Sequence, residues 1–121
     1  MVKTHGLTHI ALKVEDPDRS LRFYRAVFGV EEYFRDANSI QVTGPGPFDV
    51  IAFESSGSGV GVPGGISHFG FRLTAPSDID AAVAESLAAG GRLLRRGEFA
   101  PGLPFAYISD PDGYEIEIWY E

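Results

Sequence analysis

Apolar and polar residues alternate along residues 7–14, which are rich in Ile, Leu and Val and therefore predict a β-strand. A helix should follow, because Asp16 is a favourable N-cap and Pro17 suits the first helical position. The next apolar residues recur at helical spacing and form one face: Leu21, Tyr24, Val27 and Phe28. Gly29 is typical of the position that ends a helix.

The rest of the first half, residues 32–54, again has a strand pattern, interrupted by a turn at Gly44-Pro45-Gly46-Pro47. Residues 55–65 are rich in Gly and Ser and predict a flexible connector. Gly59, Gly61 and Gly64 match the spacing of a dinucleotide-binding loop. Pro63 lies inside that match and a strand pattern follows it, so we interpret the segment as a connector.

The second half begins with a strand over residues 66–73, and Ser77 and Asp80 then resemble a capping box before a second helix. The helix positions expected to face the core are Ile79, Ala82, Val83 and Leu87. Gly90-Gly91 ends the helix. Strands are expected around residues 92–94, 105–108 and 114–120. The last two are joined by a tight turn at Asp110-Pro111-Asp112-Gly113.

The two halves repeat one pattern. Gly6-Leu7-Thr8-His9-Ile10-Ala11-Leu12 aligns with Gly65-Ile66-Ser67-His68-Phe69-Gly70-Phe71, which places His68 59 residues after His9 (68 − 9 = 59). Near the end of each half, Ile51-Ala52-Phe53 aligns with Ile116-Glu117-Ile118. This duplication predicts two similar modules, about 5–54 and 65–120, within a single domain covering residues 1–121 and joined by the connector 55–64.

The composition narrows the possible chemistry. A chain of 121 residues with 44% hydrophobic residues suits one folded domain, and the absence of cysteine excludes disulfides, thiolate metal sites and cysteine nucleophiles. The net charge of −7 disfavours nucleic acid as a partner. No apolar segment is long enough to cross a membrane, and the N-terminal residues lack a signal-peptide pattern. We therefore expect a cytoplasmic protein without a membrane partner.

Three residues form the strongest candidate site. His9 and His68 occupy equivalent positions in the first strand of each module, so a pseudo-twofold arrangement can bring them together. Glu117 lies on the last strand between Ile116 and Ile118, whose side chains should point to the opposite face. An isolated buried carboxylate is costly, so a metal or cationic partner is the natural explanation; the alternative is that Glu117 faces solvent at a sheet edge. Two histidines and one carboxylate leave coordination positions open, unlike a closed four-ligand structural site.

The segments HIALKVEDPDRSLRFYRAVFG, SHFGFRL and YISDPDGYEIEIW resemble the vicinal oxygen chelate superfamily, which includes glyoxalase I, bleomycin-resistance proteins, fosfomycin-resistance enzymes and extradiol dioxygenases. The resemblance covers nearly the whole chain. It implies an α+β fold in which two βαβββ modules form a cup-shaped open barrel. It also implies one divalent metal ion (Fe, Mn, Ni or Zn), with His9, His68 and Glu117 as ligands.

The chain also departs from its relatives. Glyoxalase I enzymes generally supply a fourth ligand at the position of Ala52, and Glu54 would need a register shift to replace it. Tyr107 is the catalytic candidate, because related branches often carry an active-site tyrosine there; the alternative is a packed aromatic side chain. His5 is expected at the surface. Fosfomycin-type enzymes bind the phosphonate with a basic cluster, and the dense basic group here is Arg92, Arg95 and Arg96. We expect this group to be a solvated face, because its spacing from Tyr107 in the sequence does not match that role.

The leading hypothesis is a metal-dependent enzyme that is dioxygenase-like or lyase/transferase-like, whose small substrate chelates the metal through vicinal oxygens. The alternative is a non-catalytic protein of the bleomycin-resistance type, since an acidic chain suits a cationic drug. The family also implies a homodimer, so the site could form within one chain or between two. Four aromatic residues are candidates for lining the cup: Phe69, Phe71, Phe105 and Trp119. The alternative is that most of them pack in the core.

Overall fold

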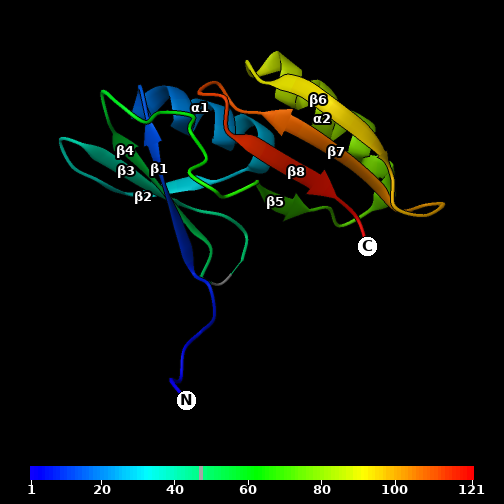
Figure 1. The fold of residues 1–121 in the computed structure, drawn as a ribbon, viewed down its shortest axis with the longest axis horizontal. Coiled ribbons are helices and arrows are strands. Elements are labelled where there is room, and N and C mark those ends of the chain that lie inside the picture. Colours follow the sequence, from blue (N-terminus) through cyan, green and yellow to red (C-terminus); the bar gives the residue numbers. More distant parts are fainter. Residues whose placement is uncertain (47) are drawn as a thin grey trace. The chain divides into compact units, whose positions relative to one another are not determined.

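Two four-stranded mixed β-sheets, each accompanied by a helix, make up the fold in a computed structural model that describes residues 1–46 and 48–121 (Figure 1). The chain divides into two compact units, Met1–Val60 and Gly61–Glu121. The α+β class and the two βαβββ modules predicted from the sequence are confirmed. Among the described residues, no helix is long and apolar enough to span a membrane.

The first unit has the sheet order β1-β4-β3-β2, in which β1 and β4 are parallel and the other neighbours are antiparallel. Its elements are β1 (His9–Val14), α1 (Pro17–Phe28), β2 (Glu31–Arg35), β3 (Ser39–Thr43) and β4 (Val50–Ser55). The predicted turn at Gly44-Pro45-Gly46-Pro47 connects β3 to β4, although Pro47 lies outside the described residues.

Both ends of α1 follow the local sequence signals. Asp16 is the N-cap, and its side chain accepts hydrogen bonds from the backbone N–H groups of Asp18 and Arg19. Pro17 occupies the first turn, as predicted. At the other end, Gly29 adopts a left-handed conformation with φ of 65° and donates its N–H to the carbonyl of Arg25. The helix boundaries predicted from the sequence are therefore confirmed.

The core of the first unit lies between α1 and the sheet. Leu21 and Tyr24 are buried as predicted, whereas Val27 and Phe28 are half-buried. Phe23, which the predicted face omitted, is also buried. The Tyr24 ring packs on Phe53 of β4 with ring centroids 5.0 Å apart. The other buried apolar side chains of this sheet come from β1, β3 and β4: Leu12, Val14, Ile40, Val42 and Ile51.

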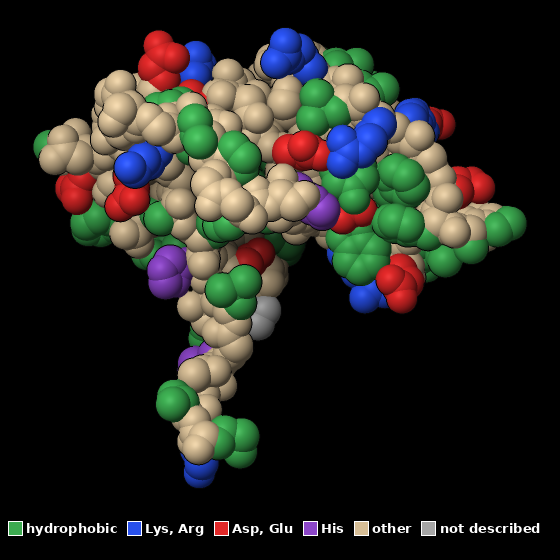
Figure 2. Space-filling model, in the orientation of Figure 1, with side chains coloured by type: hydrophobic (Ala, Val, Ile, Leu, Met, Phe, Trp, Pro, Cys, Tyr) green, Lys and Arg blue, Asp and Glu red, His purple; other side chains and the backbone are tan. Residues whose placement is uncertain are grey.

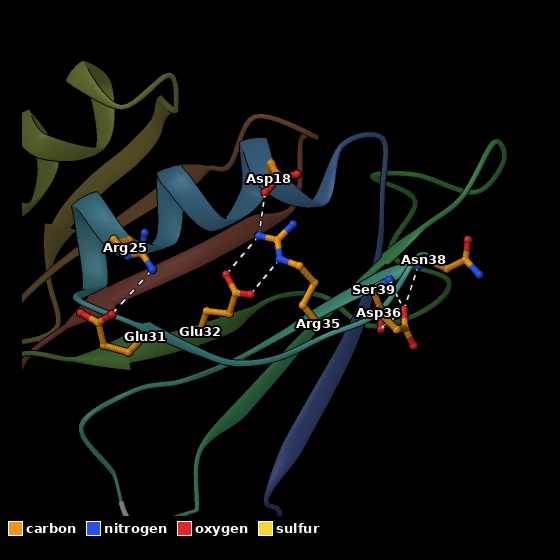
Figure 3. A network of polar contacts seen from close by, with 8 residues as sticks. All are labelled: Asp18, Arg25, Glu31, Glu32, Arg35, Asp36, Asn38 and Ser39. Atoms are coloured by element: carbon orange, nitrogen blue, oxygen red, sulfur yellow. Dashed lines mark hydrogen bonds and ion pairs between the residues drawn. The ribbon is translucent and has the colours of Figure 1, made fainter.

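A polar network attaches α1 to β2 (Figure 3). Arg35 donates one hydrogen bond of 2.8 Å to Asp18 on the helix and two, of 2.8 and 3.0 Å, to Glu32. These bonds hold the pKa values of Asp18 and Glu32 below their usual range. The predicted strand pattern is interrupted again after β2, because Asp36 accepts hydrogen bonds from the backbone of Asn38 and Ser39.

The second unit repeats the topology with the order β5-β8-β7-β6, in which β5 and β8 are parallel. Its elements are β5 (Phe69–Arg72), a short 3₁₀ helix η1 (Pro76–Asp78), α2 (Ile79–Ala88), β6 (Arg92–Glu98), β7 (Pro104–Ser109) and β8 (Glu115–Trp119). The side chains of Ile79 and Val83 on α2 are buried with those of Ile108 and Ile116 on the sheet. The order strand, helix, three strands is thus present in both units.

Two expectations for α2 are wrong. Ser77 and Asp80 do not form a capping box, because η1 precedes the helix and its N-cap, Asp78, makes no side-chain capping bond. Leu87 does not face the core, since it is 48% exposed. Ser86 is buried in its place, and its hydroxyl donates a 2.7 Å hydrogen bond to the carbonyl of Ala82. This bond satisfies a polar group that hydrophobic periodicity assigns to the surface.

The predicted turn between β7 and β8 is built around Asp110. Its side chain is buried and accepts 2.9 Å hydrogen bonds from the backbone N–H groups of Asp112 and Tyr114. Gly113 has φ of 98°, a conformation that favours glycine, and donates its N–H to the Asp110 carbonyl. The turn fixes the hairpin register that places Tyr107 beside Glu117.

Candidate metal centre

The duplication extends to the hydrogen-bond register of the two sheets. In the second unit, neighbouring strands carry one row of residues side by side: Gly70, Glu117, Tyr107 and Arg95. The corresponding row in the first unit is Ala11, Ala52, Gln41 and Phe34. Both rows follow a bulge in the edge strand, between Leu93 and Arg95 or between Glu32 and Phe34. The ionisable side chains of these two rows therefore all belong to the second module.

His68, the residue before β5, lies against Glu117 in the row of the second unit. The His68 Nε2 atom is 3.2 Å from Glu117 Oε2, and the two side chains are 30% and 14% exposed. Ser67 lies on the other side of the ring, with its hydroxyl 3.0 Å from His68 Nδ1. The Ser67 contact orients the imidazole so that Nε2 faces the carboxylate. Metal-binding histidines are commonly oriented in this way by a hydrogen bond to the ring nitrogen that does not bind the metal.

The chemistry and spacing of this pair fit a divalent metal. Imidazole nitrogen and carboxylate oxygen are ligands common to Mn, Fe, Co and Zn sites. Two such atoms bound to one ion at about 2.0–2.2 Å are separated by roughly 2.8–3.6 Å, as adjacent octahedral ligands or in tetrahedral geometry. The observed separation of 3.2 Å between His68 and Glu117 lies within that range.

Tyr107 lies on β7 directly opposite Glu117. Partial burial raises the pKa of its phenol, as does the hydrogen bond that it donates to the Glu117 carboxylate, while Arg95 acts in the opposite direction. Its ring also meets the His68 ring edge-on, with centroids 5.0 Å apart. The phenol therefore stays protonated at neutral pH, with its hydroxyl beside the donor pair.

Arg95 completes this group, contrary to the expectation from its spacing in the sequence. Its guanidinium carbon lies 3.9 Å from the centre of the Tyr107 ring, and Nη2 donates a 2.6 Å hydrogen bond to Glu115. The bulge in β6 brings Arg95 level with Tyr107. The sequence analysis missed this contact because a bulge changes which side chains share a face without a clear signal in the sequence.

Gly70 leaves room beside Glu117. A Cβ atom added at Gly70 would lie 2.8 Å from the Glu117 carbonyl oxygen and 3.4 Å from its Cβ, so a larger residue would displace β8. The equivalent position in the first unit is Ala11. The close approach of β5 and β8 therefore depends on glycine here, and it keeps the sheet surface beside the carboxylate uncovered.

The other sequence candidates for the metal site belong to the first unit. His9 is exposed on β1 of the first unit, on the same sheet face as Ala52, and Glu54 is exposed two residues further along β4. Among the described residues, no three His, Asp or Glu side chains form a group that could hold a metal. The structure describes each unit by itself, so the participation of His9 stays a prediction. His5 is exposed, as expected, and stacks on Phe48.

The four aromatic candidates for the lining divide between the two faces of the second sheet. Phe69 and Phe71 are in register with buried Ile116 and Ile118, so they belong to the core side. Phe105 and Trp119 pair with each other and share the face of Glu117. Figure 2 shows hydrophobic side chains gathered beside acidic and basic ones over the region of β7 and β8.

Comparison with known proteins identifies the family. The model of the Glyoxalase/Bleomycin resistance protein/Dioxygenase superfamily matches residues 6–118. The chain belongs to this superfamily. A glyoxalase-related enzyme from Fulvimarina pelagi is 25% identical, with a TM-score of 0.76 over 98% of this chain and 89% of the relative. A search of curated proteins found no match.

Two fosfomycin resistance proteins share the superfamily fold. FosX from Mesorhizobium loti has a TM-score of 0.79 and 17% identity, over 98% of this chain and 94% of its own. A mutant of FosX from Listeria monocytogenes has a TM-score of 0.80 and 19% identity, over 96% and 90% of the two chains. The latter was solved with Mn(II) and (1S,2S)-dihydroxypropylphosphonic acid. At these identities the likeness extends to the fold alone.

Proposed function

We propose that this superfamily member is a divalent-metal-dependent enzyme whose small substrate binds the ion through two vicinal oxygens. The observation that carries the proposal is the His68–Glu117 pair, whose nitrogen and oxygen atoms are 3.2 Å apart. The pair is only partly exposed, as expected for ligands that hold an ion while leaving one side open to substrate. The proposed reaction class is dioxygenase-like or lyase/transferase-like.

His9, His68 and Glu117 would hold the metal, which would supply Lewis-acid chemistry when bound. Ser67 would keep His68 Nε2 directed at the ion through its contact with Nδ1. His9 enters this set because its position in the first module corresponds to that of His68 in the second. The carboxylate of Glu117 would balance part of the positive charge.

Tyr107 is the proposed catalytic residue. It lies directly opposite Glu117 on the neighbouring strand, so its hydroxyl can donate a hydrogen bond or a proton to a substrate oxygen beside Glu117. Arg95 lies against the Tyr107 ring and limits its movement. A Tyr107→Phe variant should therefore keep the metal and lose turnover.

Metal analysis of protein purified without a histidine tag tests the proposal. We expect about one equivalent of Fe, Mn, Ni or Zn per chain after reconstitution, and loss of that metal in Glu117→Gln. Glu115→Gln is the matched control, because Glu115 lies two residues away on the same strand and pairs with Arg95. Equal metal content in Glu117→Gln and the control would refute the assignment of Glu117.

A second candidate function is sequestration of a cationic drug without catalysis, as in bleomycin-resistance proteins. The net charge of −7 favours this ligand class. The two functions differ in their dependence on Glu117, since drug capture by overall charge should survive Glu117→Gln. We further propose a homodimer, and light scattering would give the oligomeric state directly.

A further inference from the structure

Arginines provide all the Lys/Arg charge of the second unit: Arg72, Arg92, Arg95 and Arg96. Arg96 points away from the candidate site, because its Nη2 donates to Asp80 at 2.6 Å. Arg72 lies over the Trp119 ring and donates to the backbone carbonyl of Glu121. Arg92 is exposed and lies opposite Ser109, two residues beyond Tyr107 on β7.

Arg95 is therefore the arginine of this sheet that contacts the Tyr107–Glu117 row, and although its side chain is 55% exposed, it already has two partners. The edge of the guanidinium is bound to Glu115 at 2.6 Å, and its face covers the Tyr107 ring at 3.9 Å. An anionic group entering beside Glu117 would have to compete with Glu115 for Arg95. Glu115 balances the charge of Arg95 within the protein and so weakens its attraction for such an anion.

Aromatic rings lie beside Tyr107 and Glu117 on the same sheet face, where Arg72 covers one of them, Trp119. Phe105 is adjacent to Tyr107 on β7, with ring centroids 5.7 Å apart, and its ring lies 4.7 Å from that of Phe99. Gly97 opposite Phe105 makes room for the ring, because a Cβ there would be 3.0 Å from its Cζ. Trp119 lies on the other side of Phe105. These rings favour contact with an apolar group.

From these contacts we infer that the second module selects a chelating substrate whose remaining part is uncharged and apolar, and that Glu115 sets this selectivity by occupying Arg95. The inference rests on the proposed metal function. It predicts that a phosphonate, the group bound in the structurally similar FosX complex, is a poor ligand here. It also predicts that removing the charge of Glu115 makes Arg95 available to such an anion.

Two ligands with the same chelating head test the inference. These are 4-methylcatechol, which is apolar beyond its two vicinal oxygens, and 3,4-dihydroxybenzylphosphonate, which carries an anion at the same place. Their dissociation constants would be measured calorimetrically, without oxygen, on Co(II)-loaded wild type and on Glu115→Gln. Cobalt content of each sample would be measured in parallel.

We expect the wild type to bind methylcatechol at least about 10-fold more tightly than the phosphonate, and Glu115→Gln to reduce that ratio at least about 10-fold, the change typical of one charge-assisted hydrogen bond. Asp80→Asn is the matched control. It also removes one negative charge beside an arginine, but frees Arg96 instead of Arg95, and should leave the ratio unchanged.

Preferential binding of the phosphonate by the wild type would overturn the inference. An equal change of the ratio in Glu115→Gln and Asp80→Asn would also overturn it, because the effect would then come from overall charge. The cobalt measurement separates these failures from failure of the proposed function. Wild-type protein that retains no cobalt would contradict the metal site, and the inference would fall with it.

Discussion

Ala52 and Glu117 occupy the same register position in the two modules. Ala52 pairs with Ala11 on the parallel neighbour and with Gln41 on the antiparallel one, as Glu117 pairs with Gly70 and Tyr107. One module thus carries a carboxylate where the other carries a methyl group. Both modules nevertheless retain a histidine at the repeated position, His9 at the start of β1 and His68 just before β5.

This relationship predicts the behaviour of Ala52→Glu. Ala52 is 9% exposed, so a carboxylate there should lower the metal-free stability by at least about 1 kcal/mol. Ala52 shares a sheet face with His9, and a metal bound to His9 should therefore accept the new carboxylate as a fourth ligand. Thermal unfolding with and without Co(II) should show a larger metal-induced rise in Tm than for the wild type.

Ala52→Gln controls for side-chain size, because it adds similar bulk without a charge. It should lose stability without gaining extra stabilisation from Co(II). If the metal-induced rise in Tm of Ala52→Glu is no larger than that of the wild type, Ala52 does not border the metal site.

The Arg35 network predicts a pH-dependent contribution to stability. Hydrogen bonds from Arg35 hold the pKa values of Asp18 and Glu32 below their usual range. Because both folded-state pKa values are lowered, the stabilisation is present above the unfolded values near about pH 4 and is lost as pH falls through the folded values. Arg35→Gln should therefore have a lower Tm than wild type at neutral pH, with a difference that shrinks in acid.

Arg25→Gln is the control for this measurement, because Arg25 makes a longer contact of 3.6 Å with an exposed Glu31. Its Tm should stay close to that of the wild type throughout the pH range. A Tm difference for Arg35→Gln that persists unchanged in strong acid would show that the carboxylates are not its source.

Asp110 should matter for stability through its hydrogen bonds. Asp110→Ala leaves the N–H groups of Asp112 and Tyr114 without their acceptor, at a cost of about 1–3 kcal/mol in the free energy of unfolding. Asp110→Asn retains one acceptor oxygen and should lose less. Urea denaturation measures both values, and equal losses in the two variants would contradict the acceptor role of this side chain.

Local signals predicted the fold well, because caps and periodicity depend on neighbours in the chain. Asp16 and Gly29 set the ends of α1 through contacts within four residues. The internal repeat added long-range information, because it marks His68 and Glu117, whose side chains lie 3.2 Å apart. That contact joins the residue before β5 to β8, segments far apart in the sequence.

Features set by strand register and helix packing could not be predicted in this way. The bulge before Arg95 pairs this residue with Tyr107, whereas a regular strand would pair Leu94 with Tyr107. Ser86 replaces Leu87 in the core because a backbone carbonyl of its own helix satisfies its hydroxyl. Phe69 and Phe105 look alike in the sequence, but strand pairing places them on opposite faces.

Anomalous diffraction from crystals grown with Mn(II) or Co(II) is the most direct test of the three-ligand site. The account predicts one strong peak at roughly 2.0–2.2 Å from a nitrogen of His9, the Nε2 atom of His68 and a carboxylate oxygen of Glu117. The ligands could come from one chain or from two. A peak that lacks Glu117, or crystals with no peak between these residues at saturating metal, would contradict the account.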